Sequence, residues 1–456
     1  MSSTVRRNAR YTPLDVDGPL PLDMIRGIPA MLRNPLGWLE QAVRIHGDLV
    51  ALPLPRTPVL LVNTPSGARR VLQENHPNYT KQTVQYGALS LVTGAGLLTA
   101  DGEPWRRHRR IMQPAFHHGG LDQVAAATLT ATESLRRVWD DAPAGTPVDA
   151  DAATMRAMLE VVGRTLFADD LAGHGERVVT AVDQALHVVL ARARSPLANG
   201  PLARLPSLSR RRLRRSVATL DEVCAEVVHR RRRQGVEPED NDLLAVLLRA
   251  SDELSDREIR DELVTLVIAG HETVASSLTW TLHLLAGAPV VQKQLHAELD
   301  GVLSGAPRWA DLPALTYTRA VVDESLRLYP PAWVITRRAI NEDRIDDVTV
   351  PPGTLLLISP WLLHRREQTW PDPLRFDPSR FLGAEQSRRR EGYLPFGAGP
   401  RLCIGRDFAL VEATLVLAAL LRDRTVRQPP GTGAPAVDAL VTLRPRGGLP
   451  LLLDPR

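Results

Sequence analysis

The clearest periodic pattern along the chain is a run of apolar residues at helical spacing that begins after Ser255. Ser255 and Glu258 have the Ser-x-x-Glu spacing of a helix capping box. From there apolar residues recur every three or four positions as far as Leu285, and Gly287 and Pro289 then end the pattern. A helix of about 32 residues spans roughly 48 Å. A helix this long, with apolar residues on most of its faces, is expected to cross the middle of the fold.

Helical spacing also dominates elsewhere between Trp105 and Leu285, with a proline-marked interruption between Ser195 and Ser209. Shorter elements are predicted on both sides of this region: helices at 36–46, 65–74, 314–330 and 406–421, and strands at 49–54, 59–62, 348–350 and 355–359. Residues 11–35 are predicted to be an irregular lead-in. Residues 364–399 are predicted to be a long coil, and coils of this length usually serve function. The pattern is therefore mainly helical, with a few short strands outside the helical region.

Composition limits the kind of protein this chain can be. It has 456 residues, of which 44% are hydrophobic and 24% charged, as in ordinary globular proteins. The formal net charge is +4, and Lys81 and Lys293 are the only lysines. The arginine clusters at 210–215 and 230–233 are interpreted as solvated helix faces. Because aromatic residues make up only 4% of the chain, a nucleic-acid function is not expected.

No pattern in the chain predicts export or membrane insertion. No apolar run approaches the ~18 residues of a membrane span, and the first residues are polar, unlike a secretory signal. The two cysteines, Cys224 and Cys403, cannot form a disulfide framework. We therefore expect a cytoplasmic protein with both thiols reduced.

One of these cysteines has a setting that suggests chemistry. The segment Phe396-Gly-Ala-Gly-Pro-Arg-Leu-Cys-Ile-Gly405 places Cys403 among glycines, just before a predicted helix. Glycines let the backbone pass close to a flat group and adopt positive φ. Backbone N–H groups and the helix dipole there would favour a thiolate, and Arg401 could pair with an anionic substituent of a bound group. Cys224 lies inside an apolar helical stretch and is interpreted as inert.

This segment resembles the haem-binding signature Phe-x-x-Gly-x-Arg-x-Cys-x-Gly of the cytochrome P450 family at every fixed position. Three further segments resemble motifs of that family and lie upstream of the cysteine. They are the oxygen-activating segment Ala269-Gly-His-Glu-Thr273, the Glu-x-x-Arg pair Glu324-Ser-Leu-Arg327, and the arginine-bearing loop Phe376-Asp-Pro-Ser-Arg380-Phe381. The chain is identified as a member of this family over nearly its whole length.

The resemblance implies a fold and a reaction. The fold would be mainly α, a triangular helical prism with a small β-rich lobe. Residues 1–456 would form a single cytochrome P450 domain with residues 1–35 as a lead-in, and neither a membrane anchor nor a fused reductase is expected. The cofactor would be haem b, and Cys403 would be its iron ligand. The thiolate pushes electron density toward the iron and favours O–O cleavage, so that one atom of O₂ enters the substrate.

The long helix would supply the groups that handle oxygen. Glu272 and Thr273 are the expected catalytic residues and would deliver protons to the oxygen being activated. Thr273 could hydrogen-bond to the Ala269 carbonyl and loosen the helix locally. Ala269 and Gly270 are interpreted as small so that a ligand can approach the backbone.

Two further groups of residues follow from the resemblance. Cofactor contacts are expected from Trp105, Arg109, Arg337, Phe396, Arg401, Cys403 and Gly405. His108 has two interpretations, a contact with a haem propionate or an exposed helix position. Glu324, Arg327 and Arg380 would form a buried structural triad that holds the coil before Cys403, because an unpaired buried charge is costly.

Substrate and partners are the least specified part of the interpretation. An apolar pocket is expected at Leu97, Leu98, Leu266, Ala269, Val334 and Ile335. The segment from Arg327 to Arg338 resembles actinobacterial terpenoid hydroxylases, which favours a terpenoid or another secondary-metabolite intermediate. Electrons would come from a separate ferredoxin and an NAD(P)H-dependent reductase, steered by a basic face of Arg106, Arg110, Arg388, Arg389, Arg390 and Arg406.

Other functions stay open at this point. One is a peroxide-driven haem hydroxylase of fatty acids, and another is a non-enzymatic haem protein that binds or senses a small molecule. The Glu272–Thr273 pair argues against the first, because peroxide use needs no proton relay of this kind. We expect a monomer.

Overall fold

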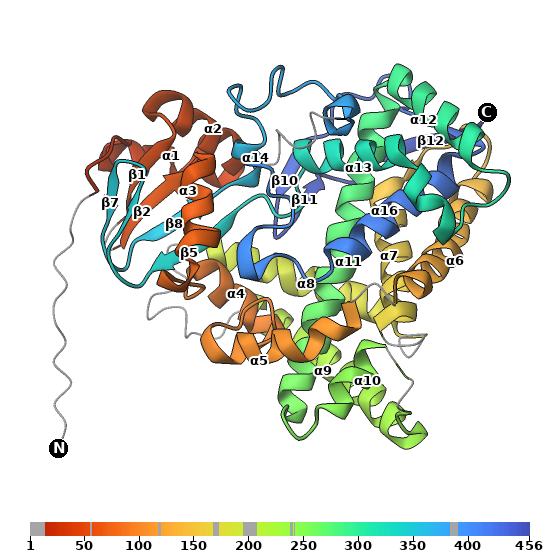
Figure 1. Cartoon of the computed structure of the whole chain (residues 1–456), viewed down its shortest axis with the longest axis horizontal. Helices are drawn as coiled ribbons and strands as arrows, with labels where there is room; N and C mark the ends of the chain where they lie inside the picture. The colour runs from red at the N-terminus through yellow and green to blue at the C-terminus, as the bar shows by residue number, and fades with distance from the viewer. Residues whose placement is uncertain are drawn as a thin grey trace.

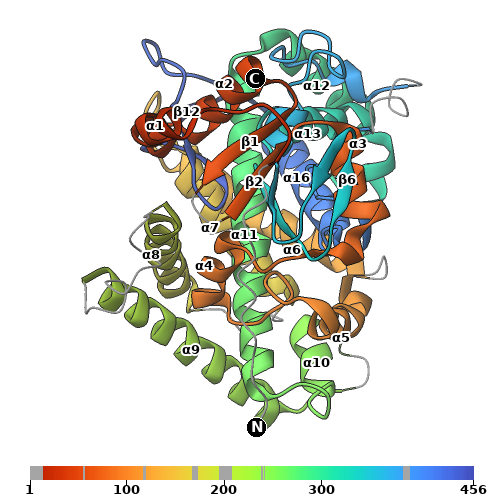
Figure 2. The ribbon, with the colours of Figure 1, turned by 90° about the vertical axis from the view of Figure 1, so that its left-hand side faces the viewer.

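A computed structural model describes residues 14–54, 57–116, 120–166, 173–194, 208–237, 240, 242–383 and 391–456. Its central element is helix α11 (Asp256–Ala286), which runs through the molecule with other helices around it (Figures 1 and 2). The predicted capping box is present, since the Ser255 hydroxyl accepts the Glu258 N–H and the Glu258 carboxylate accepts the Ser255 N–H. Most residues of α11 are buried, as its apolar pattern predicts.

Helices from both halves of the chain pack along α11. Near its C-terminal half lie α7 (Ala150–Leu166), α13 (Thr316–Leu328) and α16 (Arg406–Leu421), which share one apolar core with it. A second core joins its N-terminal half to helices that precede it in sequence. The other helices of this part of the fold are α4 (Val84–Thr93), α5 (Gly102–Met112), α6 (Leu121–Asp140), α8 (Gly175–Arg194), α9 (Leu208–Gln234), α10 (Leu243–Arg249) and α12 (Pro289–Val302).

The β-rich lobe is built on a five-stranded sheet with the strand order β1-β2-β8-β5-β3 (Figure 2). Its strands are β1 (Leu49–Leu54), β2 (Thr57–Val62), β3 (Tyr79–Thr80), β5 (Ile335–Ala339) and β8 (Leu355–Ile358). Side chains alternate across the sheet. In β2, Leu60 and Val62 therefore enter one core, while Val59 and Leu61 enter another. This sheet is buried on both faces at β2.

Smaller sheets complete the lobe and the far edge of the molecule. The hairpins are β6 (Asp343–Ile345) with β7 (Val348–Val350), and β10 (Val437–Ala439) with β11 (Leu443–Pro445). Strand β12 (Pro450–Pro455) lies between β4 (Val148–Asp149) and β9 (Arg424–Arg427). The coil before Cys403 contains the short helices α14 (Pro360–Leu363) and η7 (Pro378–Phe381).

The irregular lead-in predicted for residues 11–35 is wrong in part. Pro21–Arg33 forms α1, and Met24 is buried against the β1–β2 side of the sheet. Gly27 and Pro29 within the helix obscured it in the sequence, although proline is favoured in a first helical turn, where Pro21 lies. Helix α2 (Pro35–His46) follows as predicted.

Two other predicted segments need comment. The helix predicted at 65–74 is α3 (Pro65–Arg69) followed by a π-helical turn, η1 (Arg70–Glu74). The predicted interruption between Ser195 and Ser209 falls mainly on residues 195–207, which lie outside the described residues.

Within the described ranges, no single helix has the length and apolarity of a membrane span, and α11 and α12 meet that test only as a pair bent by 110°.

Candidate active site

The loop that carries Cys403 is shaped by close backbone contacts. The Cys403 N–H donates to the Phe396 carbonyl at 3.0 Å, which closes the loop directly before α16. Gly399 has a φ of +70°, and a Cβ atom there would lie 2.0 Å from the carbonyl oxygen of Leu72 in η1. A glycine is therefore required for the loop to pack on this turn. The loop presents Cys403 as an exposed thiol, whereas Cys224 is buried as predicted.

The electrostatic surroundings of Cys403 leave it as a thiol in the protein alone. Although the side chain is accessible, the protein atoms around it raise the pKa of its thiol by desolvation. The Gly405 N–H and the Arg109 guanidinium act in the opposite direction but do not overcome this effect. A bound metal ion deprotonates a coordinating thiol outright. The site is thus suited to a cysteine that becomes a thiolate when a metal binds.

Basic side chains gather near this loop. The Arg109 Nη1 donates to the Leu402 carbonyl at 2.8 Å, and Arg401 pairs with Asp101. Lys81 is buried, and its pKa is held well below the ordinary value by burial and by the charges of Arg337 and Arg401. Among the described residues, Asp101 provides the carboxylate that pairs with this basic group. The excess positive charge suits a ligand with several negative charges.

The other predicted cofactor contacts from α5 and β5 adjoin this basic group. The Arg401 guanidinium lies over the Trp105 ring, 4.2 Å from its centroid. On β5, Arg337 is buried and donates to the hydroxyl of Tyr86 at 3.3 Å. Arg338 instead donates to backbone carbonyls at the lobe surface. Alternation along the strand therefore turns Arg337 inward and leaves Arg338 nearer the surface.

His108 is buried between α5 and α11. Its Nδ1 lies 2.6 Å from a carboxylate oxygen of Glu262, which is also fully buried, and its Nε2 lies 3.4 Å from Glu258. Burial acts to lower the pKa of His108, but the two carboxylates outweigh it and raise the pKa. His108 thus fastens α5 to α11, and the exposed helix position is wrong.

The middle of α11 carries the predicted acid and alcohol. The Thr273 hydroxyl donates to the Ala269 carbonyl at 2.7 Å, as predicted, and both residues are half-buried. Glu272 is buried, and its Oε1 accepts a hydrogen bond from the Thr442 hydroxyl at 2.8 Å. Burial raises the pKa of Glu272 to about 7, against the lowering effect of that hydrogen bond and of the nearby Arg444.

Gly270 lies where α11 packs closely against α7. A Cβ atom at this position would lie 2.9 Å from the Cγ2 atom of Val162 on α7. The glycine therefore permits the close packing of α7 on α11.

Glu324, Arg327 and Arg380 meet in the interior. Arg327 donates to both oxygens of Glu324, at 2.7 and 2.8 Å, and both side chains are fully buried. The Arg380 Nε lies 3.4 Å from Glu324, which also accepts the Asp377 N–H at 2.9 Å. The carboxylate is satisfied from three directions, so the triad has the buried geometry that a structural role requires.

The same cluster holds the coil that leads to Cys403. The Arg327 Nη1 donates to the carbonyls of His364 and Pro373, at 2.8 and 2.7 Å. The His364 ring accepts the Leu394 N–H at its Nε2 and lies 3.1 Å from the Arg327 carbonyl at its Nδ1. Burial lowers the pKa of His364 to about 3, so the ring is neutral. This neutral histidine fixes the coil by one bond on each side.

The predicted substrate-pocket residues do not all meet. Leu97 and Leu266 are buried in one apolar core, and Leu98 packs against it. Ile335 belongs instead to the core of the sheet lobe. Ala269 and Val334 are half-buried. The structure therefore groups the first three residues and places Ile335 in a separate cluster.

Sequence reasoning missed several residues of the site. Lys81 belongs to the basic group, Asp101 pairs with Arg401, Thr442 binds Glu272, and His364 fixes the coil. One signal was available, because Lys81 is one of two lysines in a chain whose other basic residues are arginines.

Comparison with known proteins identifies the class. The family model for cytochrome P450 matches residues 29–451. The chain therefore belongs to the cytochrome P450 family and is a P450 monooxygenase, and members of this family bind haem b through a cysteine thiolate.

The relatives include three Streptomyces enzymes that align over almost the whole chain. Cyclooctatin synthase of Streptomyces melanosporofaciens is 36% identical over 434 residues, covering 93% of this chain and 91% of the relative. Cyclooctat-9-en-7-ol 5-monooxygenase of the same species is 36% identical over 438 residues, covering 94% and 92%. Pentalenene oxygenase of Streptomyces avermitilis is 34% identical over 423 residues, covering 91% and 92%.

The residues around Cys403 fit haem b. The exposed thiol offers an iron ligand on a loop that is closed by its own hydrogen bond. The excess positive charge of Arg109, Arg337 and Arg401 over Asp101 matches the two propionates of haem. The residues around this loop therefore supply both an iron ligand and positive charge for the propionates.

Proposed function

We propose that this P450 inserts one oxygen atom into a terpenoid, or into a similar apolar secondary-metabolite intermediate, with Cys403 as the iron ligand. The observation that carries the proposal is the exposed thiol of Cys403 in the family's signature loop, next to a basic group that can bind propionates. The names of the Streptomyces relatives support the substrate class. The apolar character of Leu97, Leu98 and Leu266 supports it as well.

The cofactor would be held by residues of three elements. Trp105 and Arg109 of α5, Arg337 of β5 and Arg401 before Cys403 would bind the propionates, and the missed residue Lys81 joins them. Phe396 and Gly405 would close the loop around the ligand. When bound, a thiolate-ligated haem supplies the oxidising chemistry.

The protein's own chemical task is then to manage protons. Glu272 would hold a proton on its buried carboxyl at a pH near neutrality, since its pKa is about 7. Thr273, the next residue, carries a hydroxyl whose proton is given to the Ala269 carbonyl and whose lone pairs stay free. Together, Glu272 and Thr273 would take up a proton on one side of α11 and donate it on the other side of the helix.

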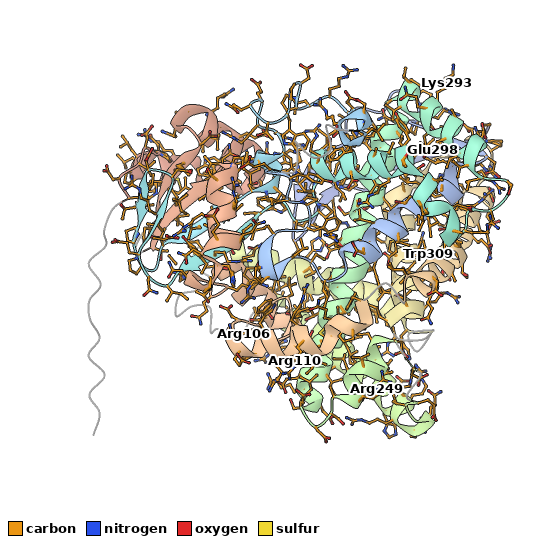
Figure 3. All side chains as sticks on the ribbon, viewed as in Figure 1. Arg106, Arg110, Arg249, Lys293, Glu298 and Trp309 are labelled. Carbon is orange, nitrogen blue, oxygen red and sulfur yellow. The ribbon has the colours of Figure 1, made fainter. Side chains whose placement is uncertain are left out.

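Electrons would come from a ferredoxin and its reductase, but the proposed basic face is weaker than the sequence suggested. Arg106 and Arg110 lie on the outer side of α5 (Figure 3). Arg106 pairs with Glu103 at 2.9 Å, and Arg110 pairs with Glu253 at 2.6 Å. Arg406 pairs with Asp407, while residues 388–390 lie outside the described residues. Because carboxylates pair with them, these arginines would act through close contacts with the ferredoxin more than through long-range attraction by net charge.

We further propose that residues 1–456 form a single domain and that the protein acts as a cytoplasmic monomer.

The experiment that tests the function measures coupling. A panel of cyclic terpene hydrocarbons is screened for a low- to high-spin shift of the Soret band, and the best ligand is turned over with ferredoxin, reductase and NAD(P)H. Thr273→Ala should keep its haem and consume NAD(P)H, but product per NAD(P)H should fall by roughly tenfold or more as hydrogen peroxide accumulates. Thr281→Ala is the matched control, because Thr281 makes the same bond to a carbonyl four residues back.

Three outcomes separate the candidate functions. Unchanged coupling in Thr273→Ala would remove Thr273 from the proton relay. Product formed only with added peroxide would favour the peroxide-driven hydroxylase. Ligand binding without any turnover would favour the non-enzymatic ligand binder.

A further inference from the structure

The loop between α4 and α5, residues 94–101, carries two of the apolar residues that we expect to face the substrate. Leu97 is buried, Leu98 is half-buried, and both lie in the apolar core at the N-terminal half of α11. The loop is braced from within, since the Thr99 hydroxyl donates to the Gly94 carbonyl at 2.7 Å. A contact that fixes part of this loop therefore fixes the place of both leucines.

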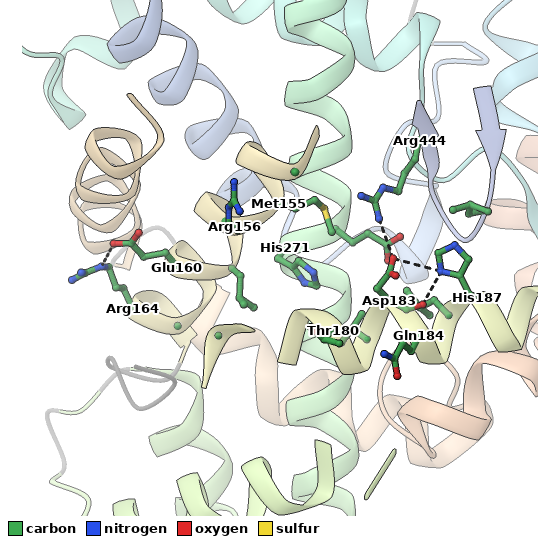
Figure 4. Close-up of a pocket in the computed structure, with 18 of the residues that line it drawn as sticks. Met155, Arg156, Glu160, Arg164, Thr180, Asp183, Gln184, His187, His271 and Arg444 are labelled. Carbon is green, nitrogen blue, oxygen red and sulfur yellow. Dashed lines mark hydrogen bonds and ion pairs between the residues drawn. The ribbon is translucent and has the colours of Figure 1, made fainter. Parts of the chain in front are cut away.

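The cavity shown in Figure 4 is a different part of the fold. It has a volume of about 940 Å³ and lies between α7, α8 and the β10–β11 hairpin. Charged side chains border it, such as Asp183 and Arg444, which form an ion pair at 3.5 Å. Among the described residues, its lining includes neither Leu97 nor Leu98. The apolar wall formed by these two leucines is therefore shaped by contacts elsewhere, along the N-terminal half of α11.

Two buried carboxylates of α11 bind the backbone of the loop. The Leu97 N–H donates to Oε2 of Glu262 at 3.0 Å, and the Ala95 N–H donates to Oδ2 of Asp261 at 2.8 Å. Glu262 is fully buried, and Asp261 is nearly so. Hydrogen bonds to a buried charged group are among the stronger ones, because water does not compete for either partner. Helix α11 thus holds the backbone of the loop at the position where the apolar wall begins.

The two carboxylates differ in the group that compensates their charge. Asp261 pairs with its neighbour Arg260 on α11, at 2.9 Å. Glu262 instead faces His108 of α5, with its Oε1 2.6 Å from Nδ1 of the ring. Burial acts to lower the pKa of His108, but Glu262 and Glu258 outweigh it and raise this pKa. The charge partner of Glu262 therefore lies on a second helix, and the pair joins that helix to the loop.

Helix α5 also contacts the loop that carries Cys403. Arg109, the residue after His108, donates to the Leu402 carbonyl at 2.8 Å. Successive residues of α5 therefore fix this helix to the Cys403 loop and to the buried carboxylate of α11. The separation between the Cys403 loop and the apolar wall is set through these few contacts.

The other end of the two-leucine segment is held from the basic group near Cys403. The buried Lys81 donates from its Nζ to the Leu98 carbonyl at 2.8 Å. The segment is therefore fastened at the Leu97 N–H by Glu262 and at the Leu98 carbonyl by Lys81. Loss of the first bond would leave the wall free to turn about the second.

We propose that Glu262, paired with His108, is a positioning residue that sets where the wall of Leu97 and Leu98 lies relative to the haem, and so which ligand shapes fit beside the iron. The inference rests on the proposed function, because it takes the two leucines as one wall of the substrate pocket. It adds the buried pair that determines the place of that wall. Glu262 and His108 would act through the Leu97 N–H rather than by touching the substrate.

Three variants separate the role of the pair from its effect on folding. Glu262→Leu with His108→Leu removes both partners, because removing one partner of a buried pair is costly whereas joint apolar replacement is often tolerated. Glu262→Gln keeps a side-chain oxygen that can accept the Leu97 N–H. Glu258→Gln is the matched control, since it takes a carboxylate from the same histidine but keeps the capping box, which accepts either residue type. If the double variant yields no haem-loaded protein, Glu262→Leu alone replaces it, because His108 can then release its proton.

The first test measures amide hydrogen exchange in the haem-loaded protein without substrate, by mass spectrometry resolved to single amides. The Leu97 amide should exchange at least several-fold faster in the double variant, whereas Glu262→Gln and Glu258→Gln should keep exchange as slow as in the wild type. The Ala95 amide, which Asp261 binds, is the internal reference and should stay slow in every variant. Unchanged exchange at Leu97 in the double variant, or an equal increase at Ala95, would overturn the role of the pair.

The second test measures the shape of the pocket with two probes that bind haem iron through the same kind of ring nitrogen, imidazole and phenylimidazole. Both dissociation constants are obtained from the shift of the Soret band. Because the phenyl group must lie along the pocket wall, the ratio of the two constants should change at least several-fold in the double variant. It should stay near the wild-type value in Glu262→Gln and in Glu258→Gln. An unchanged ratio in a double variant whose Leu97 amide exchanges faster would overturn the control of pocket shape.

These measurements use no terpenoid and no turnover, so they fail separately from the proposed function. If no terpene hydrocarbon is oxidised while the ratio changes as expected, the substrate class is wrong and the positioning role stands. Coupled turnover of a terpene together with an unchanged ratio would keep the proposed function and overturn the inference.

Discussion

Glu324 and Glu272 are both buried glutamates on helices near the centre of the fold, but their surroundings differ. Glu324 is bound by both arms of the Arg327 guanidinium, by Arg380 and by the Asp377 N–H. Glu272 has one partner, Thr442, and its second oxygen has none among the described residues. Burial raises the pKa of both carboxyl groups, but in Glu324 two arginines beside the carboxylate act against it, whereas in Glu272 the opposing groups are the Thr442 hydroxyl and the more distant Arg444.

This difference in surroundings suits Glu324 to a structural role and Glu272 to a chemical one. A buried carboxylate with cations on both oxygens ties together the elements that carry those cations, and removing it would leave them unpaired. A carboxyl group left half-satisfied in a buried site has a pKa near neutrality, so it can take up and release a proton under working conditions. Glu324 therefore stabilises the coil before Cys403, and Glu272 is suited to proton transfer.

Removing Glu324 should have the largest effect on stability. Glu324→Ala leaves Arg327 and Arg380 without their counter-charge and should cost ~3–5 kcal/mol of unfolding free energy. Urea unfolding and the haem content of the purified protein measure this loss, with Glu342→Ala as an exposed control. Normal stability and normal haem content in Glu324→Ala would contradict the structural role.

Glu272 should affect how stability depends on pH. The folded protein binds the Glu272 proton with a pKa of about 7, above the ordinary 4.5, so this stabilising effect is present at low pH and is lost as pH rises through that interval. Relative to Glu272→Gln, the wild type should lose roughly 3 kcal/mol of unfolding free energy between pH 4 and pH 8. Parallel stability curves for the two proteins would show that the carboxyl is not perturbed.

His364 should give a smaller change of the opposite sign. Its pKa is about 3 in the folded protein against an ordinary 6.5, so the unfolded chain binds the proton first and stability falls as pH drops below 6.5. At pH 5 the loss should be about 2 kcal/mol, and His364→Gln should not show it. Chemical unfolding at pH 5 and pH 7.5 tests this, and equal pH dependence in the two proteins would contradict it.

The sequence predicted those parts of the molecule whose signals are local. The capping box of α11, the Cys403 loop and the spacing of Glu324 and Arg327 each lie within a few residues, and the structure contains these elements. Membership of the family also followed from such motifs.

Contacts between distant segments could not be predicted in this way. Thr442 lies 170 residues from Glu272, and nothing in either segment indicates that they meet. The packing role of Gly270 could not be predicted, because its neighbour Val162 is on another helix. His108 was left between two interpretations because its partner, Glu262, is on α11. In each case tertiary packing supplied the information that the local pattern lacked.

The most direct test of the account is the spectrum of the reduced carbon monoxide complex. The wild type and Cys224→Ser should show the red-shifted Soret band of thiolate ligation, because Cys403 is the exposed cysteine in the signature loop. Cys403→His should bind haem without that band. If Cys403→His keeps the red-shifted band, or if Cys224→Ser loses it, then Cys403 is not the iron ligand and the assignment of the site is wrong.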